Sequence, residues 1–163
     1  RSWIQFSGKD GIRTRVLTGY RPCKTSTTSK LTTVYDQHVR FIQERGLNTT
    51  PRNKFDQDLM SELTSWIDQH IRIIVCLDAN EDVTNGPLHD MMTRLGMRNA
   101  HTLCHDIPLP ATHDRGKSPI STIFVSPTIH PLKAGILEHG IGIEGDHRNM
   151  FIDIDENNFF CIF

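Results

Sequence analysis

The segment from His70 to Asp82, HIRIIVCLDANED, constrains the fold more than any other part of this sequence. Its apolar run, Ile71 to Leu77, is too short to cross a membrane and is rich in β-branched side chains, so we predict a strand buried on both faces. Four of the five residues that follow carry oxygen atoms on polar side chains. Because open α/β sheets bind ligands at strand ends, we expect a binding cleft there.

The composition is that of an ordinary globular chain. The 163 residues are 37% hydrophobic and 23% charged, which predicts one soluble domain over residues 1–163. The formal net charge of -1 gives no general basic field, so a polyanion would need a local patch. We find neither a signal peptide nor a membrane-spanning run and expect no membrane partner.

The cysteines indicate the compartment. Cys23, Cys76, Cys104 and Cys161 are widely spaced and form no C-x-x-C pair. One of them lies inside the predicted buried strand, so we expect free thiols and an intracellular protein, nuclear or cytoplasmic.

Periodicity predicts an α/β architecture. Turn residues 8–11 join two strands, Thr50 and Pro51 begin the clearest helix, and residues 127–145 form a connection punctuated by Gly and Pro. The predicted strands are Ser2–Phe6, Ile12–Gly19, Ile71–Leu77, Thr122–Ser126 and Met150–Ile154, and the predicted helices are Thr33–Arg45, the Pro51 helix and Pro87–Leu95.

Asp78 and Asn80 follow the buried strand directly. They either cap the turn, where Asp and Asn are favoured, or supply oxygen atoms for chemistry, and their spacing leaves both interpretations open. A calcium loop beginning at Asp78 is excluded, because Val83 stands where the loop needs glycine and His89 where it needs a bidentate glutamate.

Two other polar pairs have the same ambiguity. Asp146 and His147 either form a solvated turn or supply a metal ligand and a phosphate-facing imidazole. Tyr20 and Arg21 either bind an oxyanion or are a packed ring and a surface cation.

A soft-metal site is a further alternative. His101, Cys104, His105 and His113 carry suitable ligand atoms, but their spacing matches no zinc pattern. Scattered loop residues are the other interpretation.

Four motifs together resemble the endonuclease/exonuclease/phosphatase superfamily, which has the DNase I-like fold. They are GYRP at 19–22, LDANED at 77–82, ISTIFVSP at 120–127 and GDHR at 145–148. The resemblance extends from Trp3 to about Asp155, and the connecting segments resemble the variant carried by retroelements. It implies a four-layer α/β sandwich, of which this chain holds the C-terminal half to two-thirds and lacks the N-terminal part.

The resemblance also implies a chemistry. Family members hydrolyse phosphodiesters with a divalent cation, so we expect Mg²⁺ or Mn²⁺ and a nucleic-acid substrate. Carried over by motif, Asp78 activates water, Asn80 and His147 contact the phosphate, Asp146 holds metal, and Tyr20, Arg21 and Arg148 line the phosphate site.

Two departures from the family pattern favour an alternative. Ser121 stands where the family has the aspartate that charges the catalytic histidine, with Asp114 a conceivable substitute. The family's metal-binding Asn and Glu precede the first residue of this chain. The alternative is a degenerate domain that binds nucleic acid or protein without cleaving it.

Overall fold

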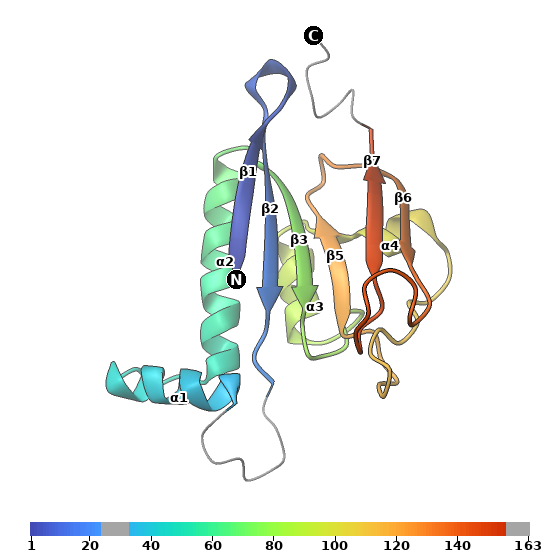
Figure 1. Ribbon diagram of the computed structural model, residues 1–163. Helices are drawn as coiled ribbons and strands as arrows, with labels where there is room; N and C mark the ends of the chain where they lie inside the picture. The colour runs from blue at the N-terminus through green and yellow to red at the C-terminus, as the bar shows by residue number, and fades with distance from the viewer. Residues whose placement is uncertain (24–32, 156–163) are drawn as a thin grey trace.

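The computed structural model describes residues 1–23 and 33–155. Its elements follow the chain as an α/β arrangement with two sheets (Figure 1). In order they are β1 (Ser2–Ser7), β2 (Arg13–Tyr20), α1 (Val34–Glu44), α2 (Pro51–Asp68), β3 (Arg72–Asp78), α3 (Pro87–Arg94), β4 (Arg98–Asn99), α4 (Ala100–Cys104), β5 (Ser121–Val125), β6 (Pro131–Ile136) and β7 (Met150–Ile154).

The predicted central strand, β3, is the middle strand of a five-stranded sheet in the order β1-β2-β3-β5-β4. It runs parallel to β2 and antiparallel to β5. Strands β6 and β7 form a separate antiparallel pair. The large sheet is therefore mixed, and β2 and β3 end at the same edge.

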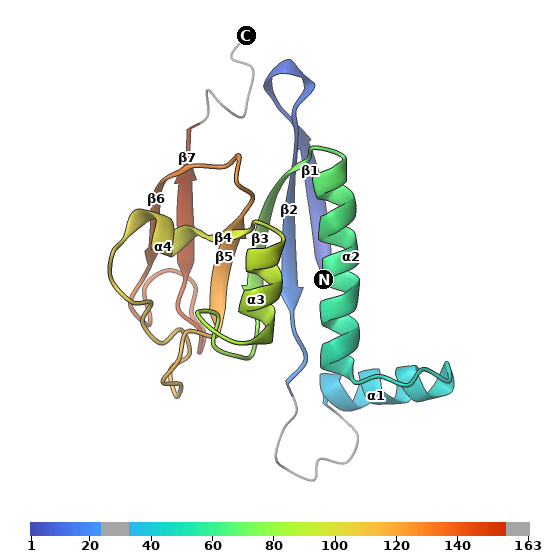
Figure 2. The ribbon, with the colours of Figure 1, turned by 180° about the vertical axis from the view of Figure 1, so that it is seen from behind.

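Both faces of β3 are buried, as its sequence predicts. Ile73, Val75 and Leu77 belong to an apolar cluster with side chains of α2 and α3, and Figure 2 shows these two helices against one side of the sheet. Ile74 belongs to a second cluster, which includes Ala134 of β6 and side chains of β5 and β7. The helices and the small sheet thus cover opposite faces of β3.

Helix α2 begins where its sequence signals predict. The Thr50 side chain accepts a hydrogen bond from the Asn53 amide, and Pro51 occupies the first turn. Its buried residues recur every three or four positions, so they form one stripe against the sheet. They are Phe55, Leu59, Leu63 and Trp66.

Three elements were not predicted. Residues 127–145 are not a strand-free connection, because Pro131–Ile136 is a strand paired with β7. Proline begins this strand and Gly135 interrupts it, so its own sequence carries little strand signal. The two-residue β4 and the five-residue α4 are too short to show the periodicity of a strand or a helix.

Other expectations concern the membrane and the thiols. No helix within residues 1–23 and 33–155 is long and apolar enough to cross a membrane. Cys76 and Cys104 are free thiols, as predicted, and Cys161 lies outside the described residues.

Candidate active site

Three polar residues meet where adjacent strands of the large sheet end or begin. In the strand register, Tyr20 pairs with Asp78, and Asp78 pairs with Ser121. Tyr20 and Asp78 are the last residues of β2 and β3, while Ser121 is the first of β5. Opposed residues on neighbouring strands share a face of a sheet, so the register alone makes these residues neighbours.

His147 joins this row from the loop before β7. Its Nδ1 lies 2.9 Å from the Ser121 hydroxyl, and its Nε2 lies 3.8 Å from a carboxylate oxygen of Asp78. Burial raises the pKa of the Asp78 carboxyl, although the charge of a protonated His147 opposes that shift. A carboxylate of raised pKa beside an imidazole can exchange protons with a bound water.

The loop after β3 uses Asp78 and Asn80 in two ways. One Asp78 oxygen accepts a hydrogen bond from the Asn80 amide at 3.3 Å, which is the turn-capping role left open above. Its other oxygen is the one that faces His147. Asn80 has a positive φ of 50°, and its side-chain amide donates to the Arg21 carbonyl at 2.9 Å. The second N–H of that amide has no acceptor within residues 1–23 and 33–155, so it can donate to a ligand.

Arg21 does not lie where we expected it. Its guanidinium is 3% exposed, donates to both carboxylate oxygens of Asp56 at 2.7 and 2.6 Å, and donates to Glu81 at 2.5 Å. Burial disfavours the charged form, but the two carboxylates outweigh it and hold the pKa of Arg21 above its ordinary value. The group is enclosed among acidic partners, so the expectation that it lines an open phosphate site is corrected.

Tyr20 and Arg148 adjoin the row through strand register or sequence, and each also faces other parts of the molecule. Tyr20 is 47% exposed and lines a groove of about 370 Å³ with residues of α1 and α2. The Arg148 amide donates to the Thr112 carbonyl at 2.8 Å. Its buried Nε has no hydrogen-bond partner among the described residues. Their roles toward a phosphate stay predictions.

His113 has other neighbours than the possible soft-metal group in which the sequence analysis considered it. Its Nε2 lies 3.4 Å from an Asp146 oxygen, and its ring meets that of His147 edge to face, with centroids 5.0 Å apart. His113, Asp146 and His147 offer ligand atoms within 4.8 Å of one another, so the group can hold a divalent metal. No local pattern links His113 to a motif 33 residues later, because only the fold joins the two loops.

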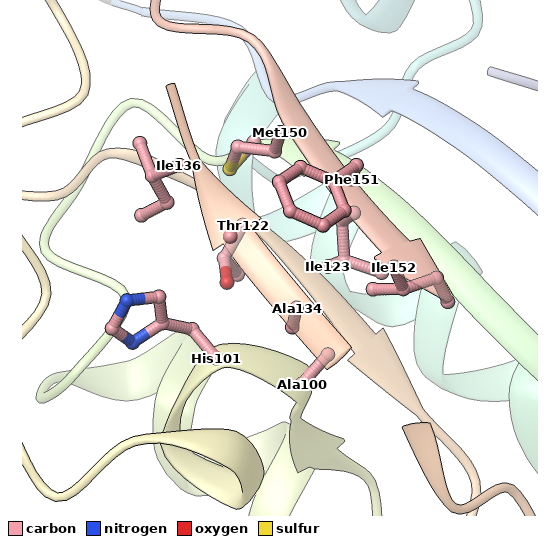
Figure 3. Close-up of a pocket in the computed structure, with 10 residues that line it drawn as sticks. Ala100, His101, Thr122, Ile123, Ala134, Ile136, Met150, Phe151 and Ile152 are labelled. Carbon is pink, nitrogen blue, oxygen red and sulfur yellow. The ribbon is translucent and has the colours of Figure 1, made fainter. Parts of the chain in front are cut away.

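The residues considered for a soft-metal site lie in two separate places. His101 and His105 lie on and just after α4, where the His105 Nε2 is 2.6 Å from the Ala134 carbonyl. The buried His101 ring faces a gap between α4 and the strands β5 and β6 (Figure 3). That gap has a volume of about 10 Å³, which is room for about one water. We assign this pair to packing, and only His113 to the candidate site.

Comparison with known proteins identifies the fold. No protein-family model and no curated protein matches the sequence. A mannosyl-6-phosphatase from Bacteroides thetaiotaomicron matches 94% of this chain with a TM-score of 0.55 and 19% identity. A 3′ phosphatase from Neisseria, solved with a product DNA hairpin, matches 91% with a TM-score of 0.60 and 12% identity. An endonuclease/exonuclease/phosphatase family protein from B. thetaiotaomicron matches 92% with a TM-score of 0.51 and 20% identity.

These likenesses confirm the predicted fold class. The matched structures share the DNase I-like architecture of the endonuclease/exonuclease/phosphatase proteins. The present chain spans 55%, 63% and 53% of the three matched chains, respectively. It therefore corresponds to a little more than half of such a domain.

Proposed function

Since the chain has the DNase I-like fold of the endonuclease/exonuclease/phosphatase proteins, we propose that it hydrolyses phosphodiester bonds of nucleic acid with the help of a divalent metal. Neighbours of this fold are phosphoester hydrolases, and one was solved with a DNA product. The single observation that carries the proposal is the meeting of Asp78, Ser121 and His147, which the chain brings together from three separate segments.

Each residue has a defined task in this proposal. Asp78, whose pKa burial raises, takes a proton from the attacking water. Asn80 donates its remaining amide N–H to a phosphoryl oxygen and so orients the phosphate. His147 lies beside Asp78. The contact between its Nδ1 and the Ser121 hydroxyl fixes the position of the ring. Tyr20 borders the phosphate from β2.

His113 and Asp146, together with His147, are the residues that would hold the divalent metal. A divalent metal at such a site polarises the phosphoryl oxygen and stabilises the charge that develops on it. The imidazole, the carboxylate and His147 form a donor set that fits a cation. Without one, the Asp78 and Asp146 carboxylates would oppose an anionic substrate.

The second candidate function is binding without cleavage. It is favoured by Ser121, whose hydroxyl contacts the imidazole at 2.9 Å but brings no negative charge to it. In a serine-protease triad an uncharged replacement of the corresponding aspartate costs about 10⁴ in rate. A domain with this loss can retain affinity for nucleic acid without useful turnover.

Plasmid nicking by the 163-residue chain, with Mg²⁺ or Mn²⁺, tests the first function. We expect nicking that Asp78→Asn and His147→Ala each reduce by about 10² or more. Asp90→Asn and His139→Ala are matched controls, because both residues are exposed and lie outside the site.

Binding of a labelled DNA duplex, followed by fluorescence anisotropy, separates the two candidates. Nicking that survives Asp78→Asn would overturn the assigned site. Binding without nicking would replace the hydrolase by the binding module. A chain that neither binds nor nicks would exclude both.

A further inference from the structure

Two loops are joined beside the candidate active site. His113 and His147 form an isolated antiparallel backbone bridge, and the Asp114 amide donates to the Asp146 carbonyl at 2.9 Å. These backbone bonds fix the spacing of the two residues along the joined loops. The fold therefore brings both side chains to the same place.

In both histidines, Nδ1 is the ring nitrogen that contacts a neighbouring oxygen. Nδ1 of His147 contacts the Ser121 hydroxyl at 2.9 Å, and Nδ1 of His113 lies 3.1 Å from a carboxylate oxygen of Asp114. Both rings thus present Nε2 to the carboxylates of the site. Histidines that bind metals are usually oriented in this way, with the other nitrogen hydrogen-bonded to an oxygen.

One further contact concerns the proton on His113. The Arg115 amide lies 3.1 Å from the same Nδ1 and donates to it, which places the proton of the neutral ring on Nε2. A cation held at Nε2 would require the other neutral tautomer, in which the proton stands on Nδ1. That nitrogen would then donate to the Asp114 carboxylate instead of accepting the Arg115 amide.

One pair of donor atoms, on His113 and Asp146, is spaced for a small cation. Nε2 of His113 and an Asp146 oxygen are 3.4 Å apart, close to the separation of about 3.4 Å that two ligands have at tetrahedral angles with bonds of about 2.1 Å. The full group of three lies within 4.8 Å. The Asp146 side chain is 67% exposed, so the group is open to solvent.

We propose that His113, Asp146 and His147 bind one divalent transition-metal ion, such as Zn²⁺ or Mn²⁺, in preference to Mg²⁺. Two imidazole nitrogens suit these ions, whereas Mg²⁺ prefers oxygen ligands and retains its water. This inference rests on the proposed function, because it names the class of metal ion that the same site would use. His147 would then help to hold the ion, which when bound would polarise the phosphoryl oxygen.

Isothermal titration of the 163-residue chain with Zn²⁺, Mn²⁺ and Mg²⁺ tests the proposal. We expect affinity to fall in that order, with no heat from Mg²⁺ at concentrations that saturate the site with Zn²⁺. His113→Ala removes a ligand and should weaken Zn²⁺ binding by more than about tenfold, while Asp114→Asn should weaken it by about tenfold. Far-UV circular dichroism verifies that each variant is folded.

Two controls address other binding places. His139→Ala removes an exposed histidine of the neighbouring loop, and Cys104→Ser removes the thiol beside His105; neither should change the affinity. Electron paramagnetic resonance of bound Mn²⁺ gives a second readout that does not depend on turnover. Binding that is unaffected by His113→Ala, or a preference for Mg²⁺, would overturn the inference.

The outcomes separate this inference from the proposed function. A chain that binds Zn²⁺ through His113 but does not nick DNA keeps the metal site and loses the hydrolase. A chain that nicks DNA with Mg²⁺ and ignores Zn²⁺ keeps the hydrolase and loses the inferred metal class.

Discussion

Ser121 has the greatest effect on the proposed chemistry of any single residue outside the reacting groups. It is 5% exposed, starts β5, and lies between Thr112, whose hydroxyl accepts its amide N–H at 3.0 Å, and His147. A neutral hydroxyl orients the imidazole but does not stabilise its protonated form. Ser121 therefore holds the His147 ring in place but lacks the negative charge that an aspartate would bring to it.

Ser121→Asp should raise the nicking rate by about tenfold or more, because a carboxylate on Nδ1 of His147 orients the imidazole and raises its basicity as a metal ligand. Single-turnover nicking of a plasmid measures this change. Ser121→Asn is the matched control, since it adds similar volume without charge and should produce no such gain. Equal rates for the two variants would show that charge at this position is not limiting.

At the scale of elements, one buried ion-pair network joins four parts of the chain. Arg21 follows β2, Asp56 belongs to α2, and Glu81 lies in the loop after β3. Glu81 also accepts the Leu88 amide in the first turn of α3. Because the Arg21 carbonyl receives the Asn80 side chain, the network fixes the loop that presents Asp78 and Asn80.

Arg21→Ala should lower the free energy of unfolding by about 3 kcal/mol or more, because it leaves Asp56 partly buried without its cation and leaves Glu81 with only the longer contact to Arg52 at 3.8 Å. Urea denaturation followed by circular dichroism measures the loss. Lys54→Ala breaks a more exposed ion pair with Asp58 on the same helix and should cost less than about 1 kcal/mol. Similar losses in the two variants would contradict a structural role for the network.

The elements also show what sequence can and cannot predict. Helix α2 and strands β3 and β7 carry their own caps or periodicity, so the start of the helix and the bounds of both strands were predicted nearly correctly. Strand β6 depends on its pairing with β7, which leaves no local trace. Asp78 and Asn80 belong to a motif, whereas His113 reaches the site only through contact between two loops. The buried position of Arg21 could not be predicted, because its acidic partners Asp56 and Glu81 are distant in sequence.

Over the whole molecule, the two faces of the large sheet are covered to different extents. The helices cover one face, and the small sheet covers the other face beside β3 and β5. Ile4, Val16 and Ile74 lie in one row across β1, β2 and β3 on this second face. Ile74 is 6% exposed, but Ile4 is 57% exposed. The small sheet therefore covers the middle strand β3 on this face but leaves the edge strand β1 exposed.

This difference gives a matched pair of substitutions. Ile74→Ala should lower the free energy of unfolding by about 2 to 5 kcal/mol, because it opens a cavity in a filled cluster. Ile4→Ala, the same change two strands away, should cost less than about 1 kcal/mol. Urea denaturation at several protein concentrations measures both. A large loss at Ile4 would show that another molecule covers this edge in solution.

The backbone bridge between His113 and His147 has a consequence for how this molecule keeps its site together. The strand end that carries Asp78 pairs with Tyr20 and Ser121, which are both distant in sequence, and the two imidazoles meet only because the bridge joins two further loops. Each group of the site is therefore held by contacts between remote segments, and local opening of the bridge is enough to separate the imidazoles from each other.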